Sequence, residues 1–233
     1  MIGVMIPAHN EEACVGACLE AVLRAASHPA LYGEAVAVVV ALDACTDRTA
    51  ELAAAYPVTL LPLQARNVGM ARAAAGVALL DAGADWLACT DADTVVADDW
   101  LVQQLKLRDE TGADAVCGTI SVLDWTPHLA RLQVLLHRFH GTYKDADGHR
   151  HIHGANFGVR AQAYRQVGGF QALGCSEDVQ LVEALEASGA AIAWSSAPRV
   201  VTSARIDSKA RGGFGDTLSA WSMALPLGQG NAG

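Results

Sequence analysis

The sequence lacks the features of several common protein classes. No run approaches the roughly 18 consecutive apolar residues that cross a membrane. The apolar start, residues 1–7, carries no basic residue and leads straight into Asn10-Glu11-Glu12, which favours a first strand over a signal peptide. The six cysteines contain no Cys-x-x-Cys pair, so we expect reduced core residues and no disulfide framework. These absences favour a cytoplasmic protein and leave open a peripheral contact with a membrane.

Positive charge is also scarce. The 233 residues hold 16 Lys and Arg against 25 Asp and Glu, a formal net charge of −9. This excess of acid argues against a nucleic-acid-binding surface, and an acidic protein that handles phosphates needs a metal ion or local arginines. Charged residues make up only 18% and hydrophobic residues 52%, which suits an α/β protein whose sheet is buried on both faces. The length allows one large domain.

Apolar runs alternate with helical periodicity through the first half of the chain. Short continuous apolar runs predict strands, and apolar residues at i, i+3, i+4 and i+7 predict helices. The alternation predicts a mostly parallel central sheet flanked by helices and joined by right-handed crossovers. The predicted strands are 2–7, 35–42, 58–63, 86–90 and 113–122, and the helices between them are 15–23, 46–56, 69–80 and 101–108.

The second half breaks this alternation. A polar loop is predicted over 142–150, and the small residues of 153–159 favour an extended segment. From Thr202 to Gly215 the chain is polar, glycine-containing and basic, which predicts a mobile substrate loop. The remaining predicted elements are helices over 127–139, 161–167 and 179–187, and a strand over 190–194.

Two carboxylates, Asp91 and Asp93, follow the fourth predicted strand. Ligands of open α/β sheets bind at the carboxyl ends of the strands. Paired carboxylate oxygens are the donors that Mg²⁺ or Mn²⁺ takes together with substrate phosphates. By itself an Asp-x-Asp turn also serves to cap the next helix or to bond its own backbone. The pair therefore predicts a site for a metal and a diphosphate only in combination with other motifs.

Such motifs occur in order along the chain, and the set resembles glycosyltransferase family 2, the GT-A-fold nucleotide-sugar transferases. The resemblance covers roughly residues 1 to 205. It implies an α/β GT-A fold and transfer of one sugar from a nucleoside diphosphate sugar, with Mn²⁺ or Mg²⁺ as cofactor. The motifs are Ile6–Glu12, Asp43–Thr49, Arg66–Arg72, Asp91–Asp93, Gly154–Asn156 with Gly168–Phe170, and Glu177–Val179.

The resemblance also implies roles for individual residues. Asp178 would be the catalytic base, with Glu177 beside it, and attack opposite the leaving group would invert the anomeric centre. Asp93 would bind the metal, and Asp91 would meet the ribose or the metal's water shell. Asp43 would accept a hydrogen bond from the nucleobase. The residues that would bind the nucleotide sugar are Pro7, His9, Glu11, Asp43, Arg66, Asp91, Ala92 and Asp93.

We expect one domain over residues 1–233, with a nucleotide-sugar-binding half (1–122) and an acceptor-binding half (123–233). A UDP- or GDP-sugar is the expected donor; the acceptor is unidentified, and a homo-oligomer is left open. The candidate acceptor contacts are His153, Asn156 and Trp125, the last as a sugar-stacking platform. His151 and His153 alternate, so a transition-metal site is a further interpretation of that pair. No transmembrane helix follows, which favours a single transfer over processive synthesis.

The sequence leaves other interpretations open. A sugar-phosphate nucleotidyltransferase shares a similar nucleotide-binding half, but it would normally carry a glycine-rich basic loop after the first strand. A catalytically silent nucleotide-sugar-binding module and a retaining transferase are further alternatives. Structural roles are also open for several of these residues. Asp43 could cap a helix near Cys45, and Glu177 and Asp178 could stabilise a helix start. Arg66 and Arg72 could be solvated charges.

One departure from the family concerns the metal. Many GT-A enzymes supply a late histidine as a ligand, whereas every histidine here lies at or before position 153. Phosphates and water would then complete the metal's ligand shell. Late cationic side chains are alternative partners of the diphosphate, namely Arg199, Arg205, Lys209 and Arg211.

Overall fold

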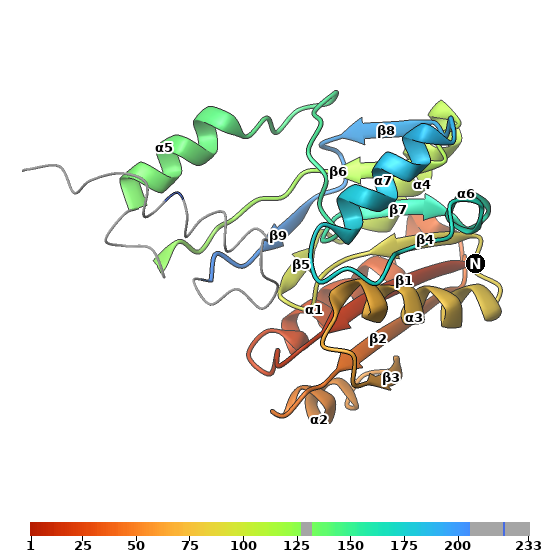
Figure 1. Ribbon diagram of the computed structural model, residues 1–233, viewed down its shortest axis with the longest axis vertical. Helices are drawn as coiled ribbons and strands as arrows, with labels where there is room; N and C mark the ends of the chain where they lie inside the picture. The colour runs from red at the N-terminus through yellow and green to blue at the C-terminus, as the bar shows by residue number, and fades with distance from the viewer. Residues whose placement is uncertain (127–131, 206–220, 222–233) are drawn as a thin grey trace, which may run out of the picture.

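The computed structural model describes residues 1–126, 132–205 and 221 (Figure 1). Its centre is a seven-stranded sheet with the order β3-β2-β1-β4-β7-β6-β8, and a second sheet pairs β5 with β9. The strands are β1 (Ile2–Ala8), β2 (Val36–Asp43), β3 (Thr59–Leu63), β4 (Trp86–Cys89), β5 (Thr94–Val96), β6 (Ala115–Gly118), β7 (Phe157–Arg160), β8 (Ile192–Ser195) and β9 (Val200–Thr202).

The directions of the strands decide which loops meet. β1 is parallel to β2 and to β4, β2 to β3, and β6 to β8, whereas β7 is antiparallel to both of its neighbours. The predicted mostly parallel sheet is therefore confirmed. The carboxyl ends of β1, β2 and β4 lie at one edge of the sheet. Because β7 runs the other way, it begins at that same edge, which brings the residues before Phe157 beside the strand-end acids.

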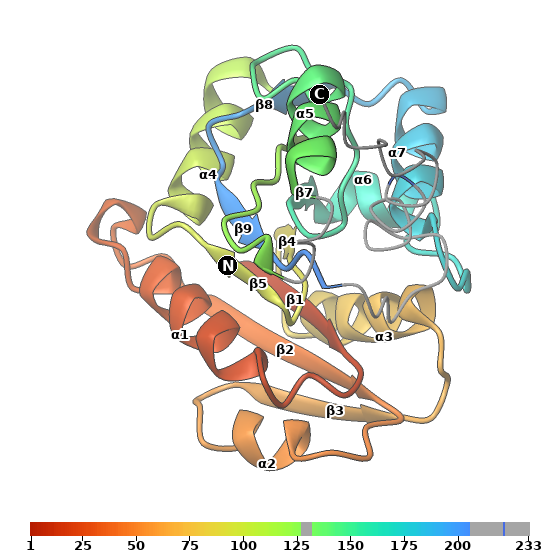
Figure 2. The same ribbon diagram turned by 90° about the vertical axis from the view of Figure 1, so that its left-hand side faces the viewer.

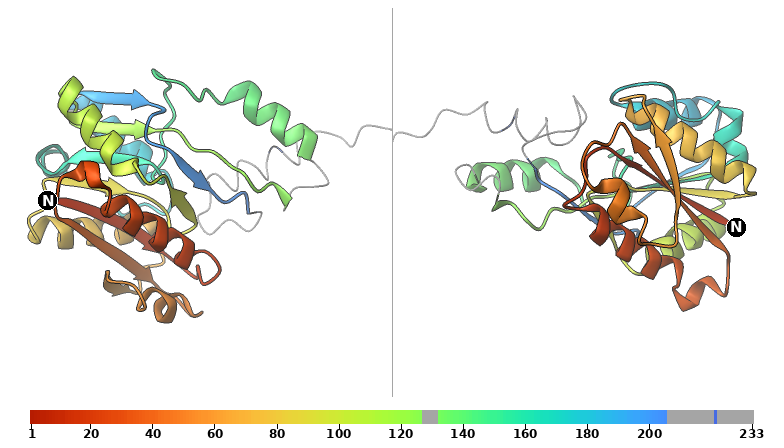
Figure 3. Two further views of the ribbon diagram at one scale, coloured as in Figure 1. Left: turned by 180° about the vertical axis from the view of Figure 1, so that it is seen from behind. Right: turned by 90° about the horizontal axis from the view of Figure 1, so that it is seen from below.

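Helices cover both faces of the sheet. Helices α3, α6 and α7 lie on one face, and α1 and α4 lie on the other, as Figure 1 and the rear view in Figure 3 show. The helices are α1 (Val15–Ala26), α2 (Thr49–Ala53), α3 (Val68–Asp81), α4 (Trp100–Thr111), α5 (Leu132–Thr142), α6 (Ala161–Gln166) and α7 (Glu177–Ala187), with a 3-10 turn η1 (Pro29–Leu31).

Alternate strand residues point to opposite faces of a sheet, and they build two separate cores. Val4 and Ile6 of β1 pack on the α1 and α4 side, while Met5 packs on the α3 and α7 side. Figure 2 shows helix α5 beside the ends of the strands. A third buried cluster lies under α5. We call it the α5 cluster; its buried members are Val122, Trp125, Leu135, Phe139 and Ala204.

The structure corrects several predicted boundaries. The predicted strand 113–122 is interrupted, because β6 ends at Gly118 and only Ser121 makes a further bridge, to Val201. The predicted helix 46–56 shrinks to the five residues of α2. The short strands β5 and β9 were not predicted at all. Residues 127–131 of one predicted helix and 206–215 of the predicted substrate loop lie outside the described residues.

Two expectations from composition can be checked in the described part of the chain. All six cysteines lie in the described residues and none forms a disulfide, as predicted; Cys18, Cys89 and Cys117 are buried. Within residues 1–126, 132–205 and 221, no helix has the length and apolar character needed to cross a bilayer.

Candidate active site

A cavity of about 810 Å³ lies at the carboxyl edge of the sheet. Its walls come from the loops after β1, β2 and β4, from the turn before β7 and from the start of α7. It brings together almost all of the predicted site residues; Trp125 and Asn156 do not line it. Those that do are Pro7, His9, Glu11, Asp43, Arg66, Asp91, Ala92, Asp93, His153, Glu177 and Asp178.

The turn after β1 is fastened to the end of β2. His9 Nδ1 lies 2.6 Å from the carbonyl oxygen of Asp43; because a carbonyl only accepts, Nδ1 carries the proton and donates. The side-chain oxygen of Asn10 accepts a hydrogen bond from the backbone N–H of Thr46 at 2.7 Å. These contacts hold the first two strand-end loops in one arrangement.

The buried carboxylate of Asp43 shapes the loop that leads into α3. Its Oδ1 accepts from the backbone N–H groups of Ala65 (2.7 Å) and Arg66 (2.9 Å), and its Oδ2 accepts from Asn67 (2.7 Å). Arg66 itself has a left-handed backbone, with φ of 50°. Asp43 therefore does not cap a helix near Cys45. Its predicted contact with a nucleobase would have to use lone pairs that these three N–H groups leave.

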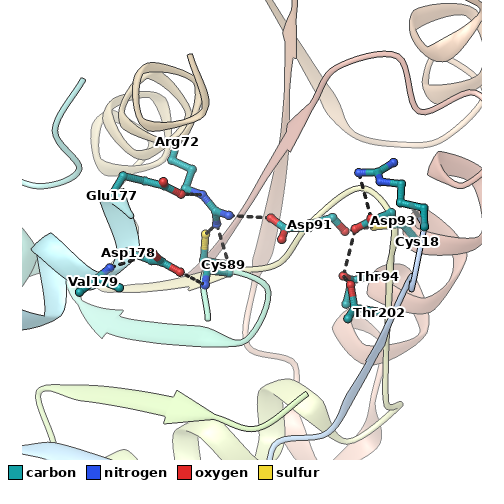
Figure 4. A network of polar contacts seen from close by, with 12 residues as sticks. Cys18, Arg72, Cys89, Asp91, Asp93, Thr94, Glu177, Asp178, Val179 and Thr202 are labelled. Carbon is teal, nitrogen blue, oxygen red and sulfur yellow. Dashed lines mark hydrogen bonds and ion pairs between the residues drawn. The ribbon is translucent and has the colours of Figure 1, made fainter. Parts of the chain in front are cut away.

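Arg72 is the hub of the polar network in Figure 4, where it lies between Asp91 and Glu177. Its Nη2 is 2.6 Å from Asp91 Oδ1, its Nη1 donates to the Gly154 carbonyl oxygen at 2.8 Å, and its Nε is 2.9 Å from Glu177 Oε1. The last contact is an ion pair without hydrogen-bond alignment. Only 3% of Arg72 is exposed, so the alternative of a solvated charge is wrong for this residue.

The two acids at the start of α7 have different surroundings. Glu177 is buried, and burial raises its pKa although Arg72 lowers it. Asp178 faces the cavity; its Oδ2 accepts from the Gly154 N–H at 2.7 Å and its Oδ1 from the Val179 N–H at 2.8 Å. The turn before β7 thus orients the Asp178 carboxylate, and Glu177 serves to anchor the helix start to Arg72.

A second arginine, Arg205, contacts the acids at the other end of the cavity. Its Nη1 is 2.6 Å from Glu11 Oε2, and its Nη2 is 3.0 Å from Asp93 Oδ2. Burial raises the pKa of Asp93 to about 6, although the guanidinium of Arg205 lowers it. Asp93 and Glu11 are thus buried acids that share Arg205 as an ion-pair partner.

The donor set fits a hard divalent cation only in part. Asp91 and Asp93 supply carboxylate oxygens, the ligand type that Mg²⁺ and Mn²⁺ prefer. Among the described residues, no group of three or more His, Cys, Asp or Glu side chains converges on one point. The residues therefore suit a cation whose shell is completed by substrate phosphates and water, and they do not form a closed protein cage.

The opposite wall of the cavity is built from stacked rings. Tyr143 lies between Phe139 and His151, with ring centroids 4.7 and 4.0 Å away. The Tyr143 hydroxyl oxygen accepts from the Ile120 N–H at 2.7 Å and lies 3.0 Å from His153 Nε2. This arrangement favours donation from the hydroxyl to Nε2, which places the His153 proton on Nδ1. No third ligand joins His151 and His153 within the described residues.

Two predicted acceptor contacts are corrected. Asn156 is 1% exposed, and its amide accepts from Trp100 Nε1 and donates to the carbonyl oxygens of Thr119 and Pro198. Trp125 belongs to the α5 cluster, and its Nε1 donates to the Val122 carbonyl. Asn156 therefore joins buried segments, and Trp125 is no stacking platform.

Sequence reasoning missed Tyr143 and undervalued Arg72. The sole signal for Arg72 was its place beside Asn67 and Gly69 in a family motif, and for Tyr143 there was no signal beyond its residue type. Of the late cations, Arg199 is exposed and paired with Asp145, while Lys209 and Arg211 lie outside the described residues.

Three solved structures of similar fold share 17–19% sequence identity with this chain. TarS of S. aureus, in complex with UDP-GlcNAc, has a TM-score of 0.66 and 17% identity over 91% of this chain and 61% of its own. The mannosyltransferase PcManGT of Pyrobaculum calidifontis, in complex with GDP-Man and Mn²⁺, has a TM-score of 0.65 and 19% identity over 89% of this chain and 58% of its own. Glucosyl-3-phosphoglycerate synthase of M. tuberculosis has a TM-score of 0.60 and 19% identity over 95% of this chain and 76% of its own. The chain thus spans about three fifths of the first two.

No curated protein sequence matches the chain significantly. The model of a protein family does: "Glycosyl transferase family 2" matches residues 3–168, well over half of the chain. The matched region contains the strand-end loops that carry Asp43, Asp91 and Asp93. It follows from this match, on the α/β fold just described, that the chain belongs to glycosyl transferase family 2.

Proposed function

We propose that the protein is a glycosyltransferase that moves one sugar from a nucleoside diphosphate sugar to an acceptor hydroxyl, with inversion of the anomeric carbon. The observation that carries this proposal is a single cavity lined by the strand-end carboxylates Asp91 and Asp93 and by the helix-start carboxylate Asp178. Family membership supports the reaction class. The fold alone would not, because one fold hosts many chemistries.

The donor would bind over the carboxyl ends of β1, β2 and β4. Pro7, His9 and Arg66 line this part of the cavity, and Arg66 is exposed enough to approach a base or phosphates. The TarS structure contains UDP-GlcNAc, and the mannosyltransferase structure contains GDP-Man. UDP- and GDP-sugars are therefore the first donors to test.

The leaving diphosphate needs neutralisation in an acidic protein. A divalent cation held by Asp91 and Asp93 would supply Lewis-acid stabilisation of the leaving group. The chain's own contribution is orientation: Arg72 fixes Asp91 through a 2.6 Å ion pair, and the same guanidinium contacts the Gly154 carbonyl. The donor end of the cavity is thereby linked to the turn that orients Asp178.

Asp178 would act as the general base. The acceptor oxygen forms a bond to the anomeric carbon as the bond from that carbon to the phosphate oxygen breaks, and the acceptor proton passes to the carboxylate. Each Asp178 oxygen already accepts one backbone N–H, which fixes the orientation of the carboxylate. A carboxylate is a weak base towards a hydroxyl and is effective when proton transfer is late.

The acceptor would lie against the ring wall. His153 and the adjacent Gly154 line the cavity together with Tyr143, and the His153 Nδ1–H would be a donor for an acceptor hydroxyl. His153 is the predicted acceptor contact that remains; Asn156 and Trp125 are omitted because they are buried elsewhere. This wall would orient a hydroxyl towards Asp178.

The first experiment is calorimetric titration of UDP and GDP into wild-type protein and Asp93→Ala, with and without Mn²⁺. We expect metal-dependent binding of one nucleotide and its loss in the variant. Asp98→Ala is the matched control, because Asp98 is an exposed acid paired with Arg24 outside the cavity. Failure of UDP, GDP and the remaining nucleotides to bind would remove the proposed function.

Turnover separates the proposal from its rivals. With the donor sugar identified, Asp178→Asn is expected to bind the nucleotide normally and to lose most transfer activity. If the wild-type protein binds the nucleotide but transfers no sugar, it is instead a catalytically silent binding module. The anomeric configuration of the product, read by proton NMR, decides between inversion and retention.

A further inference from the structure

The pairing of two short strands places Arg205 beside Asp93. Strand β9 pairs with β5 directly after Asp93, with Thr202 opposite Thr94 and their hydroxyls 3.0 Å apart. The Arg205 backbone N–H donates to Ser203 Oγ at 3.2 Å. A residue distant in sequence from Glu11 is thereby held beside the acidic end of the cavity.

The guanidinium joins two carboxylates that come from different strands. Glu11 follows β1 and Asp93 follows β4, and their side chains are only 6% and 10% exposed. Two buried acids with no cation between them would repel each other and lose solvation. The planar fork of arginine contacts both at once, at 2.6 and 3.0 Å.

The guanidinium of Arg205 lies 3.0 Å from Asp93 Oδ2, so a divalent cation bound to this carboxylate would lie close to a second positive charge, and the two cations would repel each other. We infer that Arg205 is a tethered counter-cation of the Glu11–Asp93 pair that a divalent metal must displace before it binds Asp93. This inference deepens the proposed function and rests on it for the identity of the metal. It adds an order of events to the site: the Arg205 side chain leaves Asp93 when the metal binds.

Arg72 shows by contrast why Arg205 is the exchangeable cation. Arg72 is 4% exposed at its side chain and has partners on three segments, whereas Arg205 is 28% exposed and contacts the two acids. Release of Arg205 leaves no buried cavity of the kind that Arg72 would leave. Arg205 also lines the cavity, so its side chain has open space beside it into which it can move away from Asp93.

The test is Mn²⁺ binding without nucleotide, read from the electron paramagnetic resonance signal of free Mn²⁺. Arg205→Gln and Arg205→Ala are expected to bind Mn²⁺ about tenfold more tightly than wild type, the effect of removing one competing charge. The Mn²⁺ affinity of Arg205→Lys should lie between that of wild type and that of Arg205→Gln. Arg199→Gln is the matched control, because Arg199 is an exposed arginine just before β9 that pairs with Asp145, and it should bind as wild type.

Affinity in Arg205→Gln that equals or falls below that of wild type overturns the inference, as does an absence of Mn²⁺ binding in every variant. Thermal melts identify a variant that fails to fold. Glutamine is chosen beside alanine because its side-chain amide keeps a hydrogen-bond donor near the two acids, which favours a folded variant. The proposed function is judged separately by nucleotide binding and by its dependence on Asp93. The two hypotheses can therefore fail independently.

Discussion

At the scale of single residues, the burial of His153 makes the stability of the protein depend on pH. Burial, together with the smaller effects of the neighbouring His151 and His149, lowers the pKa of His153 to about 3. In an unfolded chain a histidine has a pKa of about 6.5. Between these two values the unfolded chain binds a proton that the folded protein does not, so the free energy of unfolding falls as the pH falls.

We predict that His153 costs the protein about 2 kcal/mol of stability between pH 7 and pH 5, since unfolded His153 is largely protonated at pH 5. His153→Gln removes the titration and keeps a polar group within reach of the Tyr143 hydroxyl. Urea unfolding at pH 7, 6 and 5 should show a shallower loss in the variant than in wild type. Parallel losses in the two proteins would contradict the enclosed, neutral imidazole.

Residue type and motif were enough to predict which acids would meet at one cavity, but not the side chains that pair with them. Asp91, Asp93 and Asp178 stand in motifs whose chemistry is local to a strand end or a helix start. Arg72 and Arg205 acquire their roles from contacts with residues far away in sequence. Trp125 was misassigned because an aromatic residue at a turn is equally suited to a sugar platform and to a small core.

At the scale of elements, Arg72 joins α3 to the end of β4 and to the start of α7. A lysine in its place keeps the charge but lacks the planar fork that reaches Asp91, Glu177 and Gly154 together. We predict that Arg72→Lys lowers the free energy of unfolding by about 3 kcal/mol, the scale of a broken buried ion pair. Urea unfolding at neutral pH measures this.

Arg48→Lys is the matched control for this change. Arg48 pairs with Glu51 at the surface, where both side chains are more than 60% exposed, and such pairs contribute at most about 1 kcal/mol. Equal losses in the two variants would show that the buried network does not depend on the guanidinium geometry.

Sequence periodicity predicted the long elements and missed the short ones for a physical reason. Strand β2 and helix α3 each contain enough apolar residues to display a period, and their predicted and observed ranges nearly coincide. Strands β5 and β9 have three residues each and exist because Thr94–Val96 meets Val200–Thr202, a pairing across more than a hundred residues. No local pattern encodes such a contact.

At the scale of the whole molecule, the two main cores and the α5 cluster are separate bodies of buried side chains. The main cores lie between the sheet and its helix layers, whereas α5 extends beyond the end of the sheet in both views of Figure 3. A small cluster beside a large core can open by itself, since local opening requires less free energy than global unfolding. The ring wall of the cavity belongs partly to this region, because Phe139 is a member of the cluster.

We therefore predict that Phe139→Ala loosens α5 without unfolding the molecule. Truncation of a buried Phe costs about 3–5 kcal/mol where it is felt. By hydrogen exchange and mass spectrometry, amides of 132–142 should exchange faster in this variant, while those of β1 and β2 and the urea midpoint stay near wild type. Leu19→Ala, in the core between α1 and the sheet, should instead shift the midpoint and speed exchange throughout. If Phe139→Ala accelerates exchange in β1 as much as in α5, the cluster is part of one cooperative unit, and the ring wall cannot adjust independently of the donor half.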